Sequence, residues 1–133
     1  MTLDNRTRKS FSLASRMIPK QYKDAKKIGN KLAQIGADGL VDGGFVVILD
    51  NVYVSQKFKL ITGFNNSVTD SELYANFNIE DLKAYRDLLK SNQEFVQKIN
   101  LKTNSGVDVL LYCNITKIRE YGSIISVDKI VKR

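Results

Sequence analysis

The sequence predicts an α+β fold: a five-stranded antiparallel sheet with helices across one face, preceded by an amphipathic helix. Residues 45–49 form a continuous apolar, β-branched run that ends at the turn formers Asp50 and Asn51, as expected of a strand entering a hairpin. Residues 79–91 repeat apolar side chains at helical spacing, and from residue 95 the apolar spacing changes to every second position. Strands and helices in this order close most simply as one layered domain, as the length of 133 residues also suggests.

The segment 52–64 passes from strand to helix. Its first three residues, Val-Tyr-Val, favour a strand, whereas Phe58 and Ile61 repeat at helical spacing and Gly63 is a natural helix terminator. We expect residues 52–55 to return antiparallel to residues 45–49, and a short helix to follow directly.

Two more helices are expected before the last strands. Residues 71–77 favour a short helix or helical turn. Residues 79–91 favour a longer helix, with Glu80 and Asp81 in the first turn, where carboxylates interact favourably with the helix dipole. Its apolar stripe consists of Leu82, Tyr85, Leu88 and Leu89.

Three strands with short turns are predicted for the last third of the chain, at about 95–102, 107–116 and 123–131. One face of the middle strand is apolar and should point to the helices. The opposite, outer face carries Leu110 and Tyr112 beside Asn114 and Ile118. Water does not favour such an apolar patch, so we expect another segment or molecule to cover it.

The net charge of +7 is confined to one end of the chain. Residues 1–35 hold nine basic and two acidic residues, and the remaining residues balance at twelve of each sign. The sequence therefore divides into a basic N-terminal part and a neutral body. We expect residues 1–16 to be a disordered basic arm, residues 17–36 an amphipathic helix, and residues 44–131 the folded domain.

Composition disfavours several classes of function. The chain has no histidine, the commonest general base and a frequent ligand of zinc and haem. The single cysteine, Cys113, cannot form an intramolecular disulfide, and no apolar run is long enough for a signal peptide or a membrane span. We therefore expect a cytoplasmic protein that is not an enzyme. A cysteine among apolar neighbours is most often a small buried hydrophobe.

The predicted N-terminal helix runs from Pro19 to Ile35 and stops at Gly36. Its apolar stripe has three interpretations. The first is packing on the outer sheet face, in the same chain or in a second copy, over Leu110 and Tyr112. The second is a short coiled coil that continues a signalling helix, and the third is a nucleic acid or membrane surface facing the lysines. The third is disfavoured, because the chain shows no helix-turn-helix pattern and few aromatic residues among the charges.

Four pieces of the sequence stand in a characteristic order. They are the strand–helix Val52-Tyr53-Val54-Ser55 with Phe58, Ile61, Thr62, Gly63 and Phe64; the acidic Glu80-Asp81-Leu82; the hairpin turn Lys102 to Gly106; and the final strand near Asp128-Lys129-Ile130. In this order they resemble the PAS domains, the Per-Arnt-Sim family of sensory and interaction domains, over roughly residues 44–131. The resemblance implies a cupped sheet crossed by helices, which can hold a small ligand and usually dimerises.

The resemblance also allows two cofactors to be weighed. Haem-binding members of the family use a histidine in the helical region, which this chain lacks. Flavin-binding light sensors carry a reactive cysteine shortly after the position of Gly63-Phe64, where this chain has Asn65-Asn66-Ser67. No cofactor is therefore predicted, although an unknown small molecule remains possible. Function is decided by the site rather than by the fold.

A pocket under the helices would be lined by apolar residues that could equally fill an ordinary core. Only Gln97 and Ser126 are polar residues that could point inward, so a filled core is favoured over a ligand site. The pocket candidates are Phe58, Ile61, Phe77, Leu82, Tyr85, Leu89, Leu111, Cys113, Ile115 and Val127.

The sequence thus favours a non-catalytic signalling module that dimerises and contacts a signalling partner or a fused effector domain. The alternative is a small-molecule receptor whose ligand occupancy changes the dimer. The predicted homodimer would use the N-terminal helix and the outer sheet face. The interface candidates are Tyr22, Ile28, Leu32, Ile35, Leu110, Tyr112 and Ile118.

Overall fold

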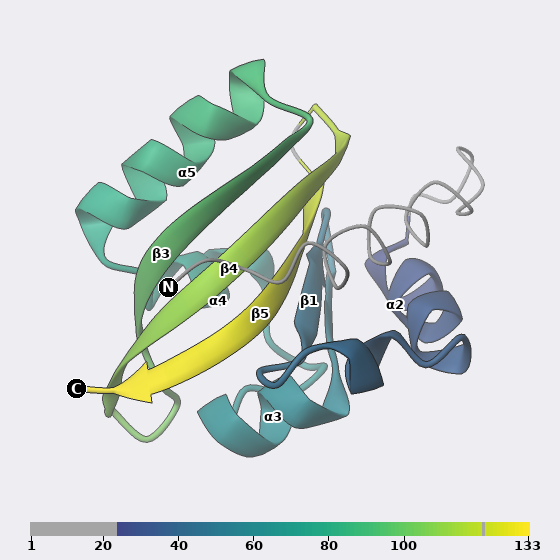
Figure 1. The fold of residues 1–133 in the computed structure, drawn as a ribbon, viewed down its shortest axis with the longest axis horizontal. Helices are drawn as coiled ribbons and strands as arrows, with labels where there is room; N and C mark the ends of the chain where they lie inside the picture. Colours follow the sequence, from purple (N-terminus) through teal and green to yellow (C-terminus); the bar gives the residue numbers. More distant parts are fainter. Residues whose placement is uncertain (1–23, 121) are drawn as a thin grey trace.

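The computed structural model describes residues 24–120 and 122–133 and has the predicted α+β architecture (Figure 1). Five antiparallel strands form one sheet in the order β2-β1-β5-β4-β3. The strands are β1 (Phe45–Ile48), β2 (Val52–Val54), β3 (Glu94–Lys102), β4 (Asp108–Arg119) and β5 (Gly122–Lys132). The helices are α2 (Ala25–Gln34), the short 3-10 helix η1 (Ala37–Leu40), α3 (Gln56–Thr62), α4 (Asp70–Ala75) and α5 (Ile79–Ser91).

The two faces of the sheet are covered by different elements. Residues from α3, α4 and α5 share one hydrophobic cluster with the inner face, where Leu111, Cys113 and Ile115 of β4 are buried. Helix α2 packs on the outer face in a second cluster, against Phe45 and Val47 of β1. In Figure 1, β4 and β5 lie in front of α4, so that the outer face is turned toward the reader.

The predicted strand-to-helix transition at residues 52–64 is confirmed. Ser55 ends β2 in an extended conformation, and its hydroxyl accepts hydrogen bonds from the backbone N–H groups of Phe45, at 2.9 Å, and Phe58, at 3.4 Å. This hydroxyl therefore caps α3 and ties it to β1. Gly63 ends α3 with φ of 79°, and its N–H donates to the carbonyl of Lys59. Glycine adopts this left-handed conformation without steric cost.

Helix α5 begins where the sequence indicates. The Asn78 side chain accepts hydrogen bonds from the N–H groups of Glu80, at 3.0 Å, and Asp81, at 3.2 Å. Tyr85 and Leu89 of its apolar stripe are buried, whereas Leu82 and Leu88 are half-buried. The helix thus turns a narrow stripe toward the core and leaves most of its surface exposed.

The predicted single helix from Pro19 to Ile35 is not continuous, because Asp24 interrupts it; residues 19–23 lie outside the described residues. Asp24 is extended, with φ of −103° and ψ of 117°, and its carboxylate accepts a hydrogen bond from the N–H of Lys26. This is an N-cap, so α2 begins at Ala25. The predicted end is confirmed, because Ile35 is the C-cap and Gly36 follows with φ of 83°. The predicted basic arm, residues 1–16, lies outside the described residues.

Two local contacts hold α2 against the sheet. Asn51, in the turn between β1 and β2, accepts a hydrogen bond from the N–H of Ala25 at 2.8 Å and donates one to the Asp24 carboxylate at 2.6 Å. One helical turn later, Gly29 lies so close to the Tyr53 ring that a Cβ atom there would overlap it. The sequence thus places a glycine inside α2 where the helix comes too close to Tyr53 for a side chain.

At each edge of the sheet, a backbone N–H donates a hydrogen bond to a side chain outside the sheet. At the β3 edge, the Asp81 carboxylate accepts from the backbone N–H of Asn100 at 2.7 Å. At the β2 edge, the Asn66 side chain accepts from the N–H of Val54 at 2.7 Å. Such capping reduces the capacity of an edge to pair with another chain.

We predict that Gly29→Ala lowers the free energy of unfolding by about 1–3 kcal/mol, because the methyl group overpacks against Tyr53. Helix propensity alone predicts the opposite sign, since alanine stabilises a helix interior by about 1 kcal/mol relative to glycine. Urea denaturation measures the difference.

The matched control is Gly39→Ala, because no atom lies within 4 Å of a Cβ placed there. It should leave the unfolding midpoint nearly unchanged. A Gly29→Ala protein as stable as the wild type would show that α2 does not depend on this close approach.

Candidate interaction surface

Most of the predicted pocket residues gather in the interior cluster. Eight of the ten are buried there and Leu82 packs against them, the eight being Phe58, Phe77, Tyr85, Leu89, Leu111, Cys113, Ile115 and Val127. Ile61 does not belong to this set, because it is 40% exposed on the outer side of α3. The buried position after Phe58 is Thr62, four residues later, instead of Ile61.

Aromatic rings occupy the space between the helices and the sheet. The Tyr85 ring, 1% exposed, has its centroid 5.8 Å from that of Tyr74, 6.3 Å from that of Phe77 and 6.4 Å from that of Phe95. Rings at these separations are in favourable tilted and edge contacts. The predicted pocket region is therefore filled, at this end, by the protein's own side chains.

A chain of hydroxyl groups crosses this aromatic cluster. The Tyr85 and Ser123 hydroxyls are 2.6 Å apart, and the Tyr74 and Tyr85 hydroxyls are 3.3 Å apart. Burial raises the pKa of both tyrosines above the ordinary value, so both phenols stay protonated at neutral pH. The hydroxyls thus satisfy one another and join α4, α5 and β5.

Cys113 lies in the same interior and is 1% exposed. Burial, and secondarily the charge of Asp81, raise the pKa of its thiol. A buried, protonated thiol is a poor nucleophile. The structure therefore agrees with the interpretation of Cys113 as a core residue.

The two polar residues that could point inward lie on opposite faces. Gln97 is opposite Cys113 and donates from Nε2 to the carbonyl of Asp81 at 2.9 Å, but its Oε1 is buried without a partner. Ser126 instead pairs with Phe45 and Asn114 on the outer face. The alternation of β5 could not settle this, because the register between β4 and β5 shifts next to Cys113.

Helix α2 covers a different part of the outer face from the part expected. Its Ile28 and Leu32 are buried with Ile124 of β5, and Ile118 packs against the same cluster. Leu110 and Tyr112 are not part of this cluster. The registers explain why: Val47 and Ile124 are neighbours under the helix, whereas Leu110 lies farther along β4, opposite Val131.

The remaining interface candidates do not gather in one place. Ile35 is 51% exposed at the end of α2, so it does not join the helix stripe in packing on the sheet. Tyr22 lies outside the described residues. Leu110 and Tyr112 are half-buried on the outer face.

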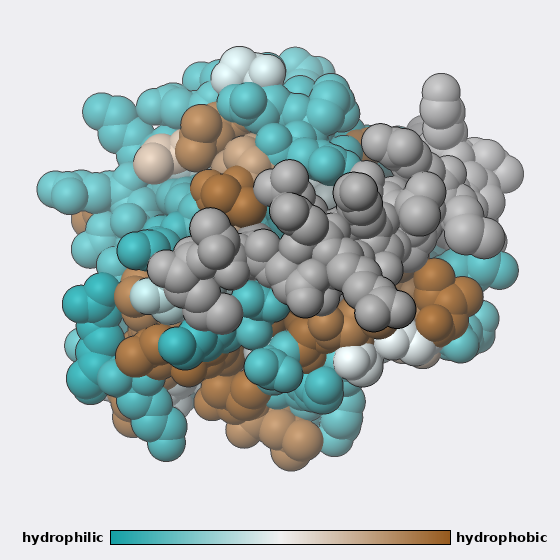
Figure 2. Space-filling model, in the orientation of Figure 1, coloured by the Kyte–Doolittle hydropathy of each residue, from teal (hydrophilic) through white to brown (hydrophobic). Residues whose placement is uncertain are grey.

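The part of the outer face that α2 leaves uncovered, among the described residues, includes side chains from β3, β4 and β5. Leu110 and Val131 form one pair across two strands, and Tyr112 lies beside Lys98 and Lys129 in the next row. Val96 follows on β3 and is 52% exposed. We call these six residues the outer patch. Figure 2, in the same view as Figure 1, shows apolar groups interrupted by hydrophilic ones on this side.

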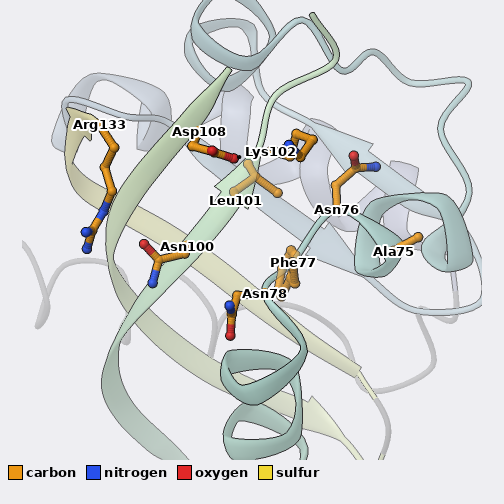
Figure 3. Close-up of a pocket in the computed structure, with 9 residues that line it drawn as sticks. All are labelled: Ala75, Asn76, Phe77, Asn78, Asn100, Leu101, Lys102, Asp108 and Arg133. Carbon is orange, nitrogen blue, oxygen red and sulfur yellow. Dashed lines mark ion pairs between the residues drawn. The ribbon is translucent and has the colours of Figure 1, made fainter. Parts of the chain in front are cut away.

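An open cleft of about 440 Å³ lies at the end of the sheet where β3 meets the α4–α5 connection (Figure 3). Phe77 and Leu101, which form an isolated β-bridge, are among its lining residues. Asn76, Asn78 and Asn100 contribute amides from neighbouring elements, and the Arg133 side chain comes from the C-terminal end. Lys102 and Asp108 form an exposed ion pair at 3.5 Å. Most of the lining residues are polar, and Phe77 is the one member of the predicted apolar set among them.

Comparison with known proteins does not identify a family. No family model matches the chain, and no curated protein matches it. Among the described residues, no helix is long and apolar enough to cross a membrane, and no three potential metal ligands gather in one place.

We predict that Tyr85→Phe lowers the free energy of unfolding by about 1–3 kcal/mol, because the buried Ser123 hydroxyl loses its partner. Adding Ser123→Ala should cost little more, since the orphaned hydroxyl is then gone. Urea denaturation of the single and double variants gives the coupling energy. Additive effects of the two substitutions would contradict the hydroxyl chain.

Proposed function

We propose that the chain is a non-catalytic PAS-type signalling module that acts through protein contacts of its outer sheet face. In this proposal it self-associates through that face and transmits a change to a partner or a fused effector. The observation that carries the proposal is the outer patch, because it exposes apolar side chains on a face that α2 covers only in part.

The interior supports this choice. The family's ligand region would lie between the sheet and the helices, where this chain has the Tyr74, Phe77, Tyr85 and Phe95 rings. The hydroxyls of Tyr85 and Ser123 are hydrogen-bonded to each other, so neither needs a ligand as its partner. A signal carried by contacts at the surface needs no occupied pocket.

The sheet edges support it as well. The Asp81 side chain accepts a hydrogen bond from a backbone N–H at the β3 edge, and the Asn66 side chain accepts one at the β2 edge. Association by strand addition is therefore less favourable than association through a face.

The order of elements agrees with the resemblance to PAS domains. Two strands, three helices and three strands follow one another, and the β2-β1-β5-β4-β3 sheet carries the three helices on one face. The proposal includes a cytoplasmic location and a function that needs neither haem nor a flavin adduct.

Self-association is tested by Leu110→Lys. We expect the wild type to form a dimer at high micromolar concentration, and the variant to weaken it at least about tenfold, because a further ammonium group would be desolvated in the interface beside the like charges of Lys98 and Lys129. Sedimentation velocity over a concentration series measures this.

The matched control is Val107→Lys, which adds the same charge at a 44% exposed valine in the turn before β4. It should leave the association unchanged. A wild type that stays monomeric would contradict self-association, and equal weakening by both variants would remove the outer patch as its site.

A small-molecule receptor is the second candidate, because the buried Oε1 of Gln97 lacks a partner beside Cys113. A ligand that donates a hydrogen bond there would satisfy it. Native mass spectrometry of the purified protein should then show a retained small molecule, which Gln97→Leu releases. A mass equal to that of the bare chain in both proteins would reject this candidate.

A further inference from the structure

The outer patch contains a row of three side chains that crosses three neighbouring strands. Lys98 of β3 and Lys129 of β5 are both register partners of Tyr112 on β4. Their ammonium nitrogens lie 5.3 Å and 6.0 Å from the centroid of the Tyr112 ring. Both distances are within the range of attractive cation–π contacts. The Tyr112 ring thus has one lysine cation against it from each neighbouring strand.

Neither lysine has a carboxylate partner among the described residues. The ion pair found among the described residues joins Lys102, at the end of β3, to Asp108, at the start of β4. Both Lys98 and Lys129 are exposed. The row is therefore positively charged, and the half-buried Leu110 and Val131 lie beside it.

We propose that this row docks an acidic amphipathic segment of another protein, its carboxylates over Lys98 and Lys129 and its apolar side chains on Leu110 and Val131. This inference rests on the proposed function, because it names the partner of the same face. The argument is charge complementarity: two ammonium groups that have no ion-pair partner among the residues the structure describes favour carboxylates, and the adjoining apolar pair favours an amphipathic segment.

A second copy fits the row less well. A two-fold symmetric contact brings the same patch of each copy together, so lysines of one copy approach lysines of the other. Like charges in an interface oppose association. An acidic partner and a second copy should therefore compete for the outer patch, and charge should favour the acidic partner.

Nucleic acid also fits less well. Proteins bind single strands by stacking bases on exposed aromatic faces. The Tyr112 ring already has a lysine against it from each neighbouring strand, so a base would have to displace one of them.

The test uses a labelled synthetic peptide of about 20 residues, enough for about five helical turns, with leucine along one face and glutamate elsewhere. Fluorescence anisotropy measures its binding to the full chain. The double variant Lys98→Gln/Lys129→Gln should weaken binding about tenfold, as expected for the loss of two exposed ion pairs. The same peptide with glutamine in place of glutamate should bind the wild type about equally weakly.

The matched control is Lys26→Gln/Lys27→Gln, which removes two exposed positive charges from α2. It should leave peptide binding within about twofold, because single exposed charges outside the contact contribute little. Equal weakening by both double variants would overturn the proposal in favour of non-specific attraction to a basic chain. Undetectable binding of the glutamate peptide by the wild type would overturn it directly.

Salt separates this inference from the proposed function. Raising the salt concentration should weaken peptide binding and strengthen self-association, because it screens attraction in one case and repulsion in the other. Suppose that substitution of Leu110 weakens self-association, but the Lys98→Gln/Lys129→Gln and Lys26→Gln/Lys27→Gln variants bind the peptide equally. The acidic partner is then excluded, and self-association through the outer patch stands. Loss of vesicle or oligothymidine binding in Lys98→Gln/Lys129→Gln, without loss of peptide binding, would assign the row to a membrane or nucleic acid instead.

Discussion

Burial of β1 on both of its faces is the constraint on which the rest of the structure depends. All four of its residues are buried: Val46 and Ile48 face the interior, and Phe45 and Val47 face α2. A strand buried on both sides must be covered by two layers, so α2 is required at this place and cannot serve the rest of the sheet. For this reason α2 does not reach the part of the outer face around Leu110 and Tyr112, and that part supplies the surface that we assign to partners.

The same constraint explains the small residues near α2. The helix can lie close to β2 only because Gly29 has no side chain to meet the Tyr53 ring. Asn51 then fixes where the helix starts, through its hydrogen bonds to Ala25 and Asp24. The interior is organised differently: large rings and a chain of hydroxyls fill it. The outer face is thus packed by the close approach of α2 to β2, and the inner face by large side chains.

The sequence predicted much of the fold because its signals are local. Hairpin turns, alternation of apolar and polar residues, and helix caps all depend on neighbouring residues. The structure has all five predicted strands, α3 ends at Gly63, and α5 starts after Asn78. The sequence favoured Pro19 as the helix start because proline suits a first helical turn. Asp24 instead caps the N–H of Lys26 and is held by Asn51, which is distant in sequence. The site was harder to predict. Lys98, Tyr112 and Lys129 form a row only through the registers of three strands and a shift between β4 and β5, which no local pattern encodes.

The central claim is that the module works through the outer patch, and methyl NMR tests it most directly. The side-chain methyl groups of Leu110, Val131 and Val96 report on the patch, whereas Leu60 and Ile79, which are 73% and 82% exposed elsewhere, serve as controls. The account predicts that, between dilute and concentrated samples, the patch signals shift while the control signals stay fixed. Shifts confined to Leu60 and Ile79, with an unchanged outer patch, would contradict it.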